Sequence, residues 1–211
     1  MRAAIPPLLP PQWSGAYVSY WFPMLPDDQI SSGFCWFDYT RNLCRIDGLF
    51  NPWPERETGY RLWMSEIGDA THGRSHKRKV AYSRERTPEG DCLAARLLAE
   101  EISPLDALYL PQGVLREYGA RHAGTHQVLG RPADAWTYER PGKGPSTLYV
   151  QTGSRQLLRM VTGEAGVRAS IRDFPNLCTR PIPGWVFATD AAGAAVFASD
   201  SAGMDNGSSS S

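Results

Sequence analysis

Short segments in which apolar and polar residues alternate recur along most of this chain. In residues 14–22 the alternation places Tyr17, Ser19 and Trp21 on one face of an extended strand and the intervening residues on the other. The same pattern predicts strands over residues 14–22, 33–39, 43–50, 60–67, 77–86, 125–130, 134–140, 146–151, 156–163 and 167–174. Because short connections rich in turn residues join neighbouring segments, we expect an antiparallel meander.

Other segments favour helices or loops. Residues 91–102 and 111–119 have helix-like patterns, and residues 182–188 resemble a closing helical turn. Residues 1–12 form a proline-rich lead-in, since proline fixes φ and removes a backbone donor. The sequence therefore predicts a mainly β (α+β) fold, in which a single curved antiparallel sheet wraps around a few helices.

We expect one domain and a tail. The 211 residues correspond to about one domain, which we place at residues 1–188. Residues 189–211 are rich in Ala, Gly, Ser and Asp, and such a segment buries too little apolar surface to offset chain entropy. This segment is predicted to be a disordered C-terminal tail. A large curved sheet also leaves one concave face available for an apolar pocket.

Charge and cysteine content narrow the class of protein. The 22 basic residues equal the 22 acidic ones, which argues against a nucleic-acid-binding module. No apolar run approaches the roughly 20 residues of a membrane span. Four prolines interrupt the N-terminal apolar stretch, so it does not match a signal peptide. We therefore expect a cytoplasmic protein with free thiols, and leave open whether Cys35 and Cys44 approach each other.

Two motifs that suggest ligands are weak. His72 with His76, and His122 with His126, have the HxxxH spacing, but a glycine interrupts each pair and no carboxylate lies between them. In residues 142–147, GKGPST, the lysine precedes glycine rather than Ser or Thr, so a hairpin turn is favoured over a phosphate loop. The sequence predicts no metal site and no cofactor site.

Glu66 is the strongest candidate for acid–base chemistry. It alternates with Tyr60, Leu62 and Met64, which are the apolar face of its predicted strand. A carboxyl group on an apolar face retains its proton to higher pH, which suits general acid–base catalysis. The alternative is a structural glutamate at a strand end, solvated or paired with an arginine.

Weaker candidates lie on other predicted strands and loops. Tyr17 and Ser19 can present two hydroxyl groups to one pocket, and Asn51 and Pro52 begin a loop at a strand end. Arg172 either pairs with a protein carboxylate or binds a substrate carboxylate, and the adjacent Asp173 points to the opposite strand face.

Long segments of the chain resemble the VioE family of violacein biosynthesis. They include AYVSYW (16–21), CWFDY (35–39), CRIDGLFNPW (44–53), TGYRLWMSE (58–66), KVAYSRERT (79–87), RPGKGPSTLY (140–149) and RASIRDFPN (168–176). The resemblance runs from about residue 6 to Ala188. It implies a half barrel similar to the bacterial lipoprotein carriers LolA and LolB, and a homodimer.

The resemblance also implies an activity. Members of this family take a short-lived indole-3-pyruvate imine dimer from a haem coupling enzyme and direct a 1,2-shift of one indole ring, without any cofactor. The product is prodeoxyviolaceinic acid (protodeoxyviolaceinate). By matching motifs, the resemblance implies Glu66 as the proton-transfer residue. The implied substrate-binding residues are Tyr17, Ser19, Phe50, Asn51, Pro52 and Arg172.

Two other functions remain open at this point. One is a non-catalytic carrier or template that shields an apolar indole-type ligand, and the other is a scaffold that improves the upstream coupling enzyme. Turnover of many molecules per protein indicates an enzyme, whereas stoichiometric binding indicates a carrier.

Overall fold

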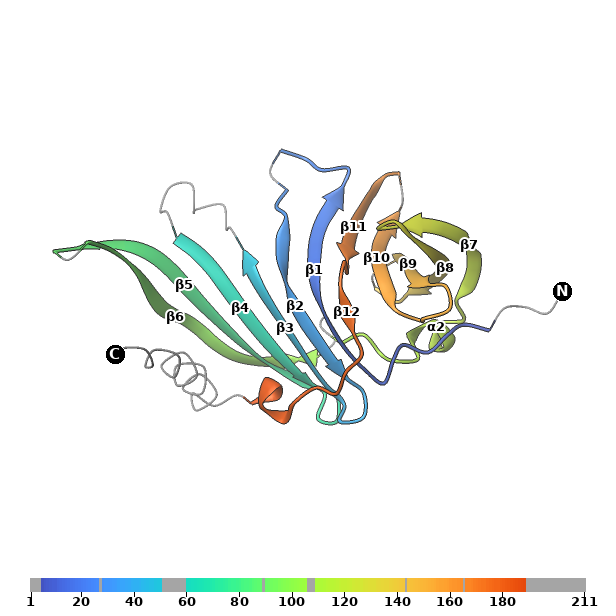
Figure 1. Ribbon diagram of the computed structural model, residues 1–211, viewed down its shortest axis with the longest axis horizontal. Coiled ribbons are helices and arrows are strands. Elements are labelled where there is room, and N and C mark those ends of the chain that lie inside the picture. The colour runs from blue at the N-terminus through green and yellow to red at the C-terminus, as the bar shows by residue number, and fades with distance from the viewer. Residues whose placement is uncertain are drawn as a thin grey trace, which may run out of the picture.

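The computed structural model shows one curved antiparallel sheet with very little helix (Figure 1). It describes residues 5–26, 28–50, 60–88, 90–105, 109–142, 144–164 and 166–188. The strands are β1 (Gln12–Phe22), β2 (Ser31–Asp38), β3 (Leu43–Phe50), β4 (Tyr60–Asp69), β5 (Arg74–Thr87), β6 (Gly90–Pro104), β7 (Arg121–Val128), β8 (Arg131–Arg140), β9 (Gly144–Gln151), β10 (Leu157–Glu164), β11 (Arg168–Asp173) and β12 (Leu177–Cys178). The helical turns are α2 (Val114–Glu117) and the 3₁₀ turn η2 (Gly184–Phe187).

The sheet is built from two meanders. Its strand order is β6-β5-β4-β3-β2-β1-β11-β10-β9-β8-β7, and β12 pairs separately with β1. Strands β1 to β6 form one meander and β7 to β11 the other, each from strands adjacent in the sequence. The antiparallel pairing of β1 with β11, from Val18↔Asp173 to Phe22↔Ala169, joins them.

The segment between β6 and β7 must pass from one edge of the sheet to the other. It runs along one end of the strands, at the bottom of Figure 1, and includes α2. Leu105 donates its backbone N–H to Gly73, Leu9 donates to Gln112, and the Tyr39 hydroxyl donates to the Leu110 carbonyl at 2.9 Å. These contacts fix the crossing segment against the inner, concave face.

An aromatic cluster lies under this crossing segment. Trp13 is 1% exposed, stacks on Phe37 with ring centroids 4.5 Å apart, and meets Phe174 edge-on at 5.7 Å. The buried side chains Leu9, Leu105, Leu110, Val114 and Leu115 from outside the strands belong to the same core. Aromatic pairs of this kind contribute about 1 kcal/mol each beyond the area that they bury. The core therefore sits at one end of the inner face.

The predicted strands are confirmed with shifts at their ends. The segment 43–50 coincides with β3, and the alternation in residues 14–22 is confirmed by burial of Trp13, Gly15 and Tyr17 on one face of β1. The short helix expected within 111–119 is α2, and the closing turn in 182–188 is η2.

The helix predicted over residues 91–102 is wrong. These residues lie within β6, which pairs along its length with β5, from Arg74↔Pro104 to Thr87↔Gly90. A long hairpin supplies a hydrogen-bonded partner for the segment, and such tertiary pairing overrides a local helical pattern. The tail predicted at 189–211 and the loop at 51–59 lie outside the described residues.

Asp38 closes the β2–β3 turn from inside the protein. Its carboxylate is fully buried and accepts hydrogen bonds from the Thr40 hydroxyl at 2.6 Å, the Gln12 amide at 2.8 Å, and the Arg41 guanidinium. Arg41 also donates to the Ile182 carbonyl, so it ties the C-terminal segment to this turn. Burial alone would raise the pKa of Asp38, but the hydrogen bonds from Thr40, Arg41 and Gln12 outweigh it and lower the pKa below its ordinary value.

Asp38 therefore stabilises the fold above the ordinary Asp pKa, and this stabilisation is lost as pH falls through the lowered folded-state pKa. We predict that Asp38→Asn lowers the free energy of unfolding by about 2 kcal/mol at neutral pH. The difference should shrink in acid. Urea unfolding across the acidic range measures it, with the exposed Glu164→Gln as control. A difference that stays constant down to the lowest pH would contradict this account.

Candidate active site

The candidate site lies on the inner face of the sheet and adjoins the aromatic core, to which Tyr17 belongs. Tyr17 and Ser19 project from β1, and Arg172 projects from β11. The register pairs Ser19 directly with Arg172, so their side chains share a face. We call Tyr17, Ser19 and Arg172 the arginine cluster.

Arg172 packs over the ring of Tyr17. Its guanidinium carbon lies 4.9 Å from the ring centroid, a cation–π geometry. Tyr17 is 3% exposed, and burial raises the pKa of its hydroxyl to about 12, although the positive charge of Arg172 opposes the increase. Tyr17 is therefore a neutral phenol that holds the guanidinium in place.

Arg172 has no protein counter-ion within the described part of the chain. Its Nε atom is buried there without a hydrogen-bond partner. The adjacent Asp173 points to the opposite face, as strand alternation predicts, where Arg159 binds it through Nε at 2.5 Å and Nη2 at 2.9 Å. An unpaired, partly buried cation is costly, and a carboxylate from a ligand is the group that best satisfies it.

Gly33 makes room for the Tyr17 ring. It pairs with Tyr17 across β1 and β2, and a Cβ atom at this position would lie 2.8 Å from the Tyr17 hydroxyl oxygen. Such a Cβ would also collide with the Asp47 carbonyl oxygen of β3. Gly48 pairs with Gly33 on the next strand, so a side-chain-free strip of the inner face separates Tyr17 from Met64 on β4.

Glu66 lies on the same face, away from the arginine cluster. Its carboxylate accepts a hydrogen bond from the Ser75 hydroxyl at 2.7 Å and faces the Lys77 ammonium at 3.8 Å. We call Glu66, Ser75 and Lys77 the glutamate cluster. The sequence placed Glu66 on an apolar face, and the structure adds a hydroxyl group and an ammonium group beside its carboxylate. Among the described residues its charged partner is a lysine, not the arginine that the structural alternative named.

The two clusters lie on opposite sides of the side-chain-free strip. Glu66 pairs with Ile46, Ile46 with Cys35, and Cys35 with Gly15 of β1. Three strand spacings amount to about 14 Å, so Glu66 does not touch Tyr17 directly.

Three of the predicted site residues cannot be placed in this geometry. Asn51 and Pro52, and the side chain of Phe50, lie outside the described residues. Sequence reasoning missed Ser75 and Lys77, because their proximity to Glu66 depends on the β4–β5 register. The glycines at 33 and 48, inside predicted strands, were an available signal of close backbone or ligand approach.

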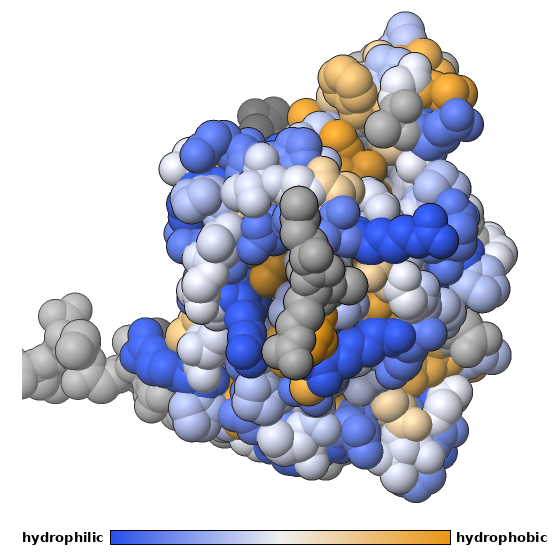
Figure 2. Space-filling model, turned by 90° about the vertical axis from the view of Figure 1, so that its right-hand side faces the viewer, coloured by the Kyte–Doolittle hydropathy of each residue, from blue (hydrophilic) through white to orange (hydrophobic). Residues whose placement is uncertain are grey.

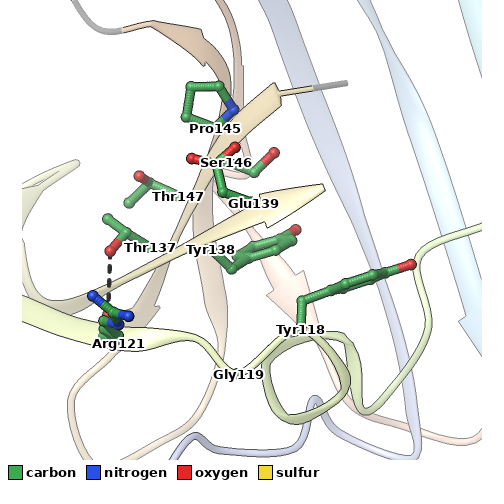
Figure 3. Close-up of a pocket in the computed structure, with 9 residues that line it drawn as sticks. All are labelled: Tyr118, Gly119, Arg121, Thr137, Tyr138, Glu139, Pro145, Ser146 and Thr147. Atoms are coloured by element: carbon green, nitrogen blue, oxygen red, sulfur yellow. Dashed lines mark hydrogen bonds between the residues drawn. The ribbon is translucent and has the colours of Figure 1, made fainter. Parts of the chain in front are cut away.

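Cavities lined wholly by described residues lie elsewhere. One of about 340 Å³ opens beside the end of α2, between Tyr118, whose ring stacks on Tyr138, and Arg121 (Figure 3). Another, of about 370 Å³, lies beside η2 and is lined by residues including Leu43, His76 and Phe187. None of the predicted site residues lines either cavity.

The histidines and cysteines make local contacts. His72 lies 2.5 Å from Asp69 in a turn, and His76 lies 2.8 Å from Glu100. Cys35 and Cys44 are free and buried, and burial raises the pKa of each thiol to about 12. In the described ranges, no group of three or more His, Cys, Asp or Glu side chains is arranged to hold a metal ion.

Apolar side chains are exposed where β1 connects to β2. Trp21, Phe22, Met24, Leu25 and Ile30 are each 40% exposed or more. This connection forms the protruding top of the molecule, where hydrophobic residues gather (Figure 2). Arg168 braces it by pairing with Asp28 at 2.6 Å and covering the Trp21 ring. No helix in the described part of the chain is long and apolar enough to cross a membrane.

Solved structures with a similar course of the chain have low sequence identity to it. An uncharacterized conserved protein from Thermus thermophilus is 10% identical, with a TM-score of 0.47, over 87% of this chain and 89% of the other. A LolA superfamily protein from Nitrosomonas europaea is 8% identical, with a TM-score of 0.36, over 84% and 90%. A putative outer membrane lipoprotein-sorting protein domain from Vibrio parahaemolyticus is 7% identical, with a TM-score of 0.35, over 83% and 88%.

A search of curated protein sequences finds no match. The family model of the violacein biosynthetic enzyme VioE, by contrast, matches residues 6–187, which span both meanders and include both clusters. This chain belongs to the VioE family of violacein biosynthetic enzymes.

Proposed function

We propose that this protein is a cofactor-free enzyme that binds the indole-3-pyruvate imine dimer and directs a 1,2-shift of one indole ring to give prodeoxyviolaceinic acid. Family membership supports the pathway. The observation that carries the substrate assignment is the Arg172 guanidinium on the inner face, for which the described part of the chain supplies no counter-ion. The proposed substrate contains two indoles and two carboxylates, one of each from either half, and this face offers a cation for a carboxylate.

In this proposal the arginine cluster anchors the substrate. The Arg172 guanidinium binds a carboxylate, and its stacking on Tyr17 fixes the direction of approach. Ser19 lies level with Arg172 across the β1–β11 pair and offers a hydroxyl for orientation. Gly48, beside Gly33 on the next strand, adds no side chain to this face, so we propose that a planar ring lies close to the sheet there, next to Tyr17. Phe50, Asn51 and Pro52 are proposed as further substrate-binding residues on the strength of the family motif.

Glu66 is proposed as the catalytic residue. During the shift, the carbon–carbon bond to the indole breaks at one atom as it forms at the neighbouring atom, and the shift itself needs no oxidant or reductant. A carboxylate beside the migrating ring accepts a proton from the indole or imine nitrogen and returns it as charge moves. Holding the migrating ring against its new position lowers the barrier by several kcal/mol.

Two other functions are distinguishable by experiment. A carrier binds its ligand stoichiometrically, whereas an enzyme turns over many molecules per protein. A scaffold loses its effect when the coupled intermediate is made separately and mixed in rapidly, whereas an independent enzyme does not. Rapid mixing that yields no rearranged product with the separately made intermediate would reject the enzyme proposal in favour of the scaffold.

The remaining partners are also proposals. We propose a cytoplasmic homodimer that receives its substrate from the haem coupling enzyme of the pathway. Exposed Trp21, Phe22 and Ile30 near the β1–β2 connection support self-association, since contiguous apolar surface marks interaction sites. Sedimentation analysis gives the oligomeric state, and a monomer at micromolar concentration would reject the homodimer.

Arg172→Met is predicted to weaken binding of indole-3-pyruvate about 10- to 100-fold, because a charge-assisted hydrogen-bond pair is lost. The free energy of unfolding should be unchanged or higher, since the described chain supplies no counter-ion. Arg159→Met, which breaks the ion pair with Asp173, should show the reverse: lower stability and unchanged binding. Calorimetric titration and urea unfolding measure both. Unchanged affinity in Arg172→Met would contradict the proposal that Arg172 binds a carboxylate of the substrate.

Glu66→Gln is predicted to lower the yield of rearranged product at least about 100-fold, since it removes a general base while conserving side-chain size. Circular dichroism and affinity for indole-3-pyruvate should remain unchanged, because Glu66 lies three strands from β1. Product analysis by chromatography and mass checks the yield. Equal activity in the variant would exclude proton transfer by Glu66 and leave pure templating.

A further inference from the structure

Ser75 is a buried hydroxyl committed to one carboxylate oxygen. It is 1% exposed, at the start of β5, and its Oγ donates to Glu66 Oε1 at 2.7 Å. A serine hydroxyl has one proton, and here that proton lies between Ser75 and Glu66. The contact between the Ser103 and Ser75 hydroxyls at 3.0 Å is therefore donated by Ser103. The hydroxyls form a chain from Ser103 through Ser75 to Glu66.

Lys77 lies near the other oxygen of the same carboxylate. Its Nζ atom lies 3.8 Å from Glu66 Oε2 and 3.7 Å from Glu101 Oε1. Lys79 also reaches Glu101, at 3.4 Å. These groups come from three adjacent strands, β4, β5 and β6, at paired register positions. The Glu66 side chain is 14% exposed, so part of the carboxylate reaches solvent, while Oε1 accepts a hydrogen bond and Oε2 faces the Lys77 charge.

The protein contains a close structural match without a catalytic assignment. Ser65, adjacent to Glu66 on β4, is also buried and donates to Asp47 Oδ1 at 2.7 Å. Arg45 supplies the positive charge there, and its Nε atom lies 2.8 Å from the same oxygen. This second network faces the outer side of the sheet, because Ser65 and Glu66 are consecutive in one strand. The fold therefore offers two similar hydroxyl–carboxylate–cation groups, one on each face, which differ in that Ser65 and Arg45 share one carboxylate oxygen.

We propose that Ser75 and Lys77 are positioning residues for Glu66, which orient its carboxylate toward the substrate on the inner face. This inference rests on the proposed role of Glu66 in proton transfer. A glutamate has three rotatable side-chain bonds, and a general base acts only when its oxygen is held within hydrogen-bond reach of the proton. Ser75 fixes Oε1 and Lys77 restrains Oε2, so the rotations are restricted before substrate arrives.

The test compares Ser75→Ala with Ser65→Ala in the complete pathway reaction. Ser75→Ala is expected to lower the ratio of rearranged to unrearranged product about tenfold, because a displaced catalytic group loses rate steeply. Affinity for indole-3-pyruvate should stay within about twofold, since the proposed carboxylate anchor lies elsewhere on the face. Ser65→Ala should lose similar stability in urea and keep its product ratio. Ser75→Thr, which retains the hydroxyl, should restore most of the ratio.

A double variant separates the two proposals. In a Glu66→Gln background, Ser75→Ala should cause no further loss, because a positioning residue acts only through the carboxylate. If Glu66→Gln itself retains activity, the role of Glu66 fails. If Glu66→Gln is inactive but Ser75→Ala behaves like Ser65→Ala, the positioning inference alone fails. Lys77→Met gives a second variant that leaves the hydroxyl chain intact, and it should also lower the product ratio without changing affinity.

Discussion

The requirement that one segment cross the whole sheet organises this fold. Because β6 and β7 are opposite edge strands, the chain between them must pass across the sheet, and its described residues, 105 and 109–120, lie at one end of the inner face. Leu110, Val114 and Leu115 bury their side chains there against Trp13. Tyr17 belongs to this same core, and Ser19 and Arg172 pair further along the same face. The arginine cluster therefore adjoins the core instead of lying apart from it.

The pairing of β1 with β11 is the second constraint on this fold. It closes two meanders into one sheet, and it places Arg172 beside Tyr17 although the two lie near opposite ends of the sequence. Asp173 and Arg159 complete an ion pair on the outer side. Among the described residues, Arg172 on the inner side has an aromatic ring as its contact and a buried Nε atom without a hydrogen-bond partner.

Sequence alone predicted the parts of this architecture that depend on local pattern. Alternation located β1 to β5 and the opposite orientation of Arg172 and Asp173. The sequence prediction failed at residues 91–102. The alanines and leucines there favour a helix locally, but pairing with β5 makes the segment a strand. The sequence prediction also gave Glu66 an apolar environment, because the positions of Ser75 and Lys77 follow from hairpin register and not from spacing along one strand. The family segments, rather than periodicity, linked Tyr17, Glu66 and Arg172 to a single function.

The central claim is that the inner face converts its ligand rather than merely holding it. The most direct measurement supplies tryptophan to the flavin oxidase and haem coupling enzyme of the pathway, with and without this protein at a concentration far below that of the tryptophan consumed. Chromatography and mass analysis then identify the product. Without a VioE protein, the coupled intermediate is expected to form chromopyrrolic acid, the unrearranged product. The account predicts that prodeoxyviolaceinic acid replaces it, with many molecules formed per protein. Chromopyrrolic acid formed at an undiminished level in the presence of folded protein would contradict the account and favour a ligand carrier.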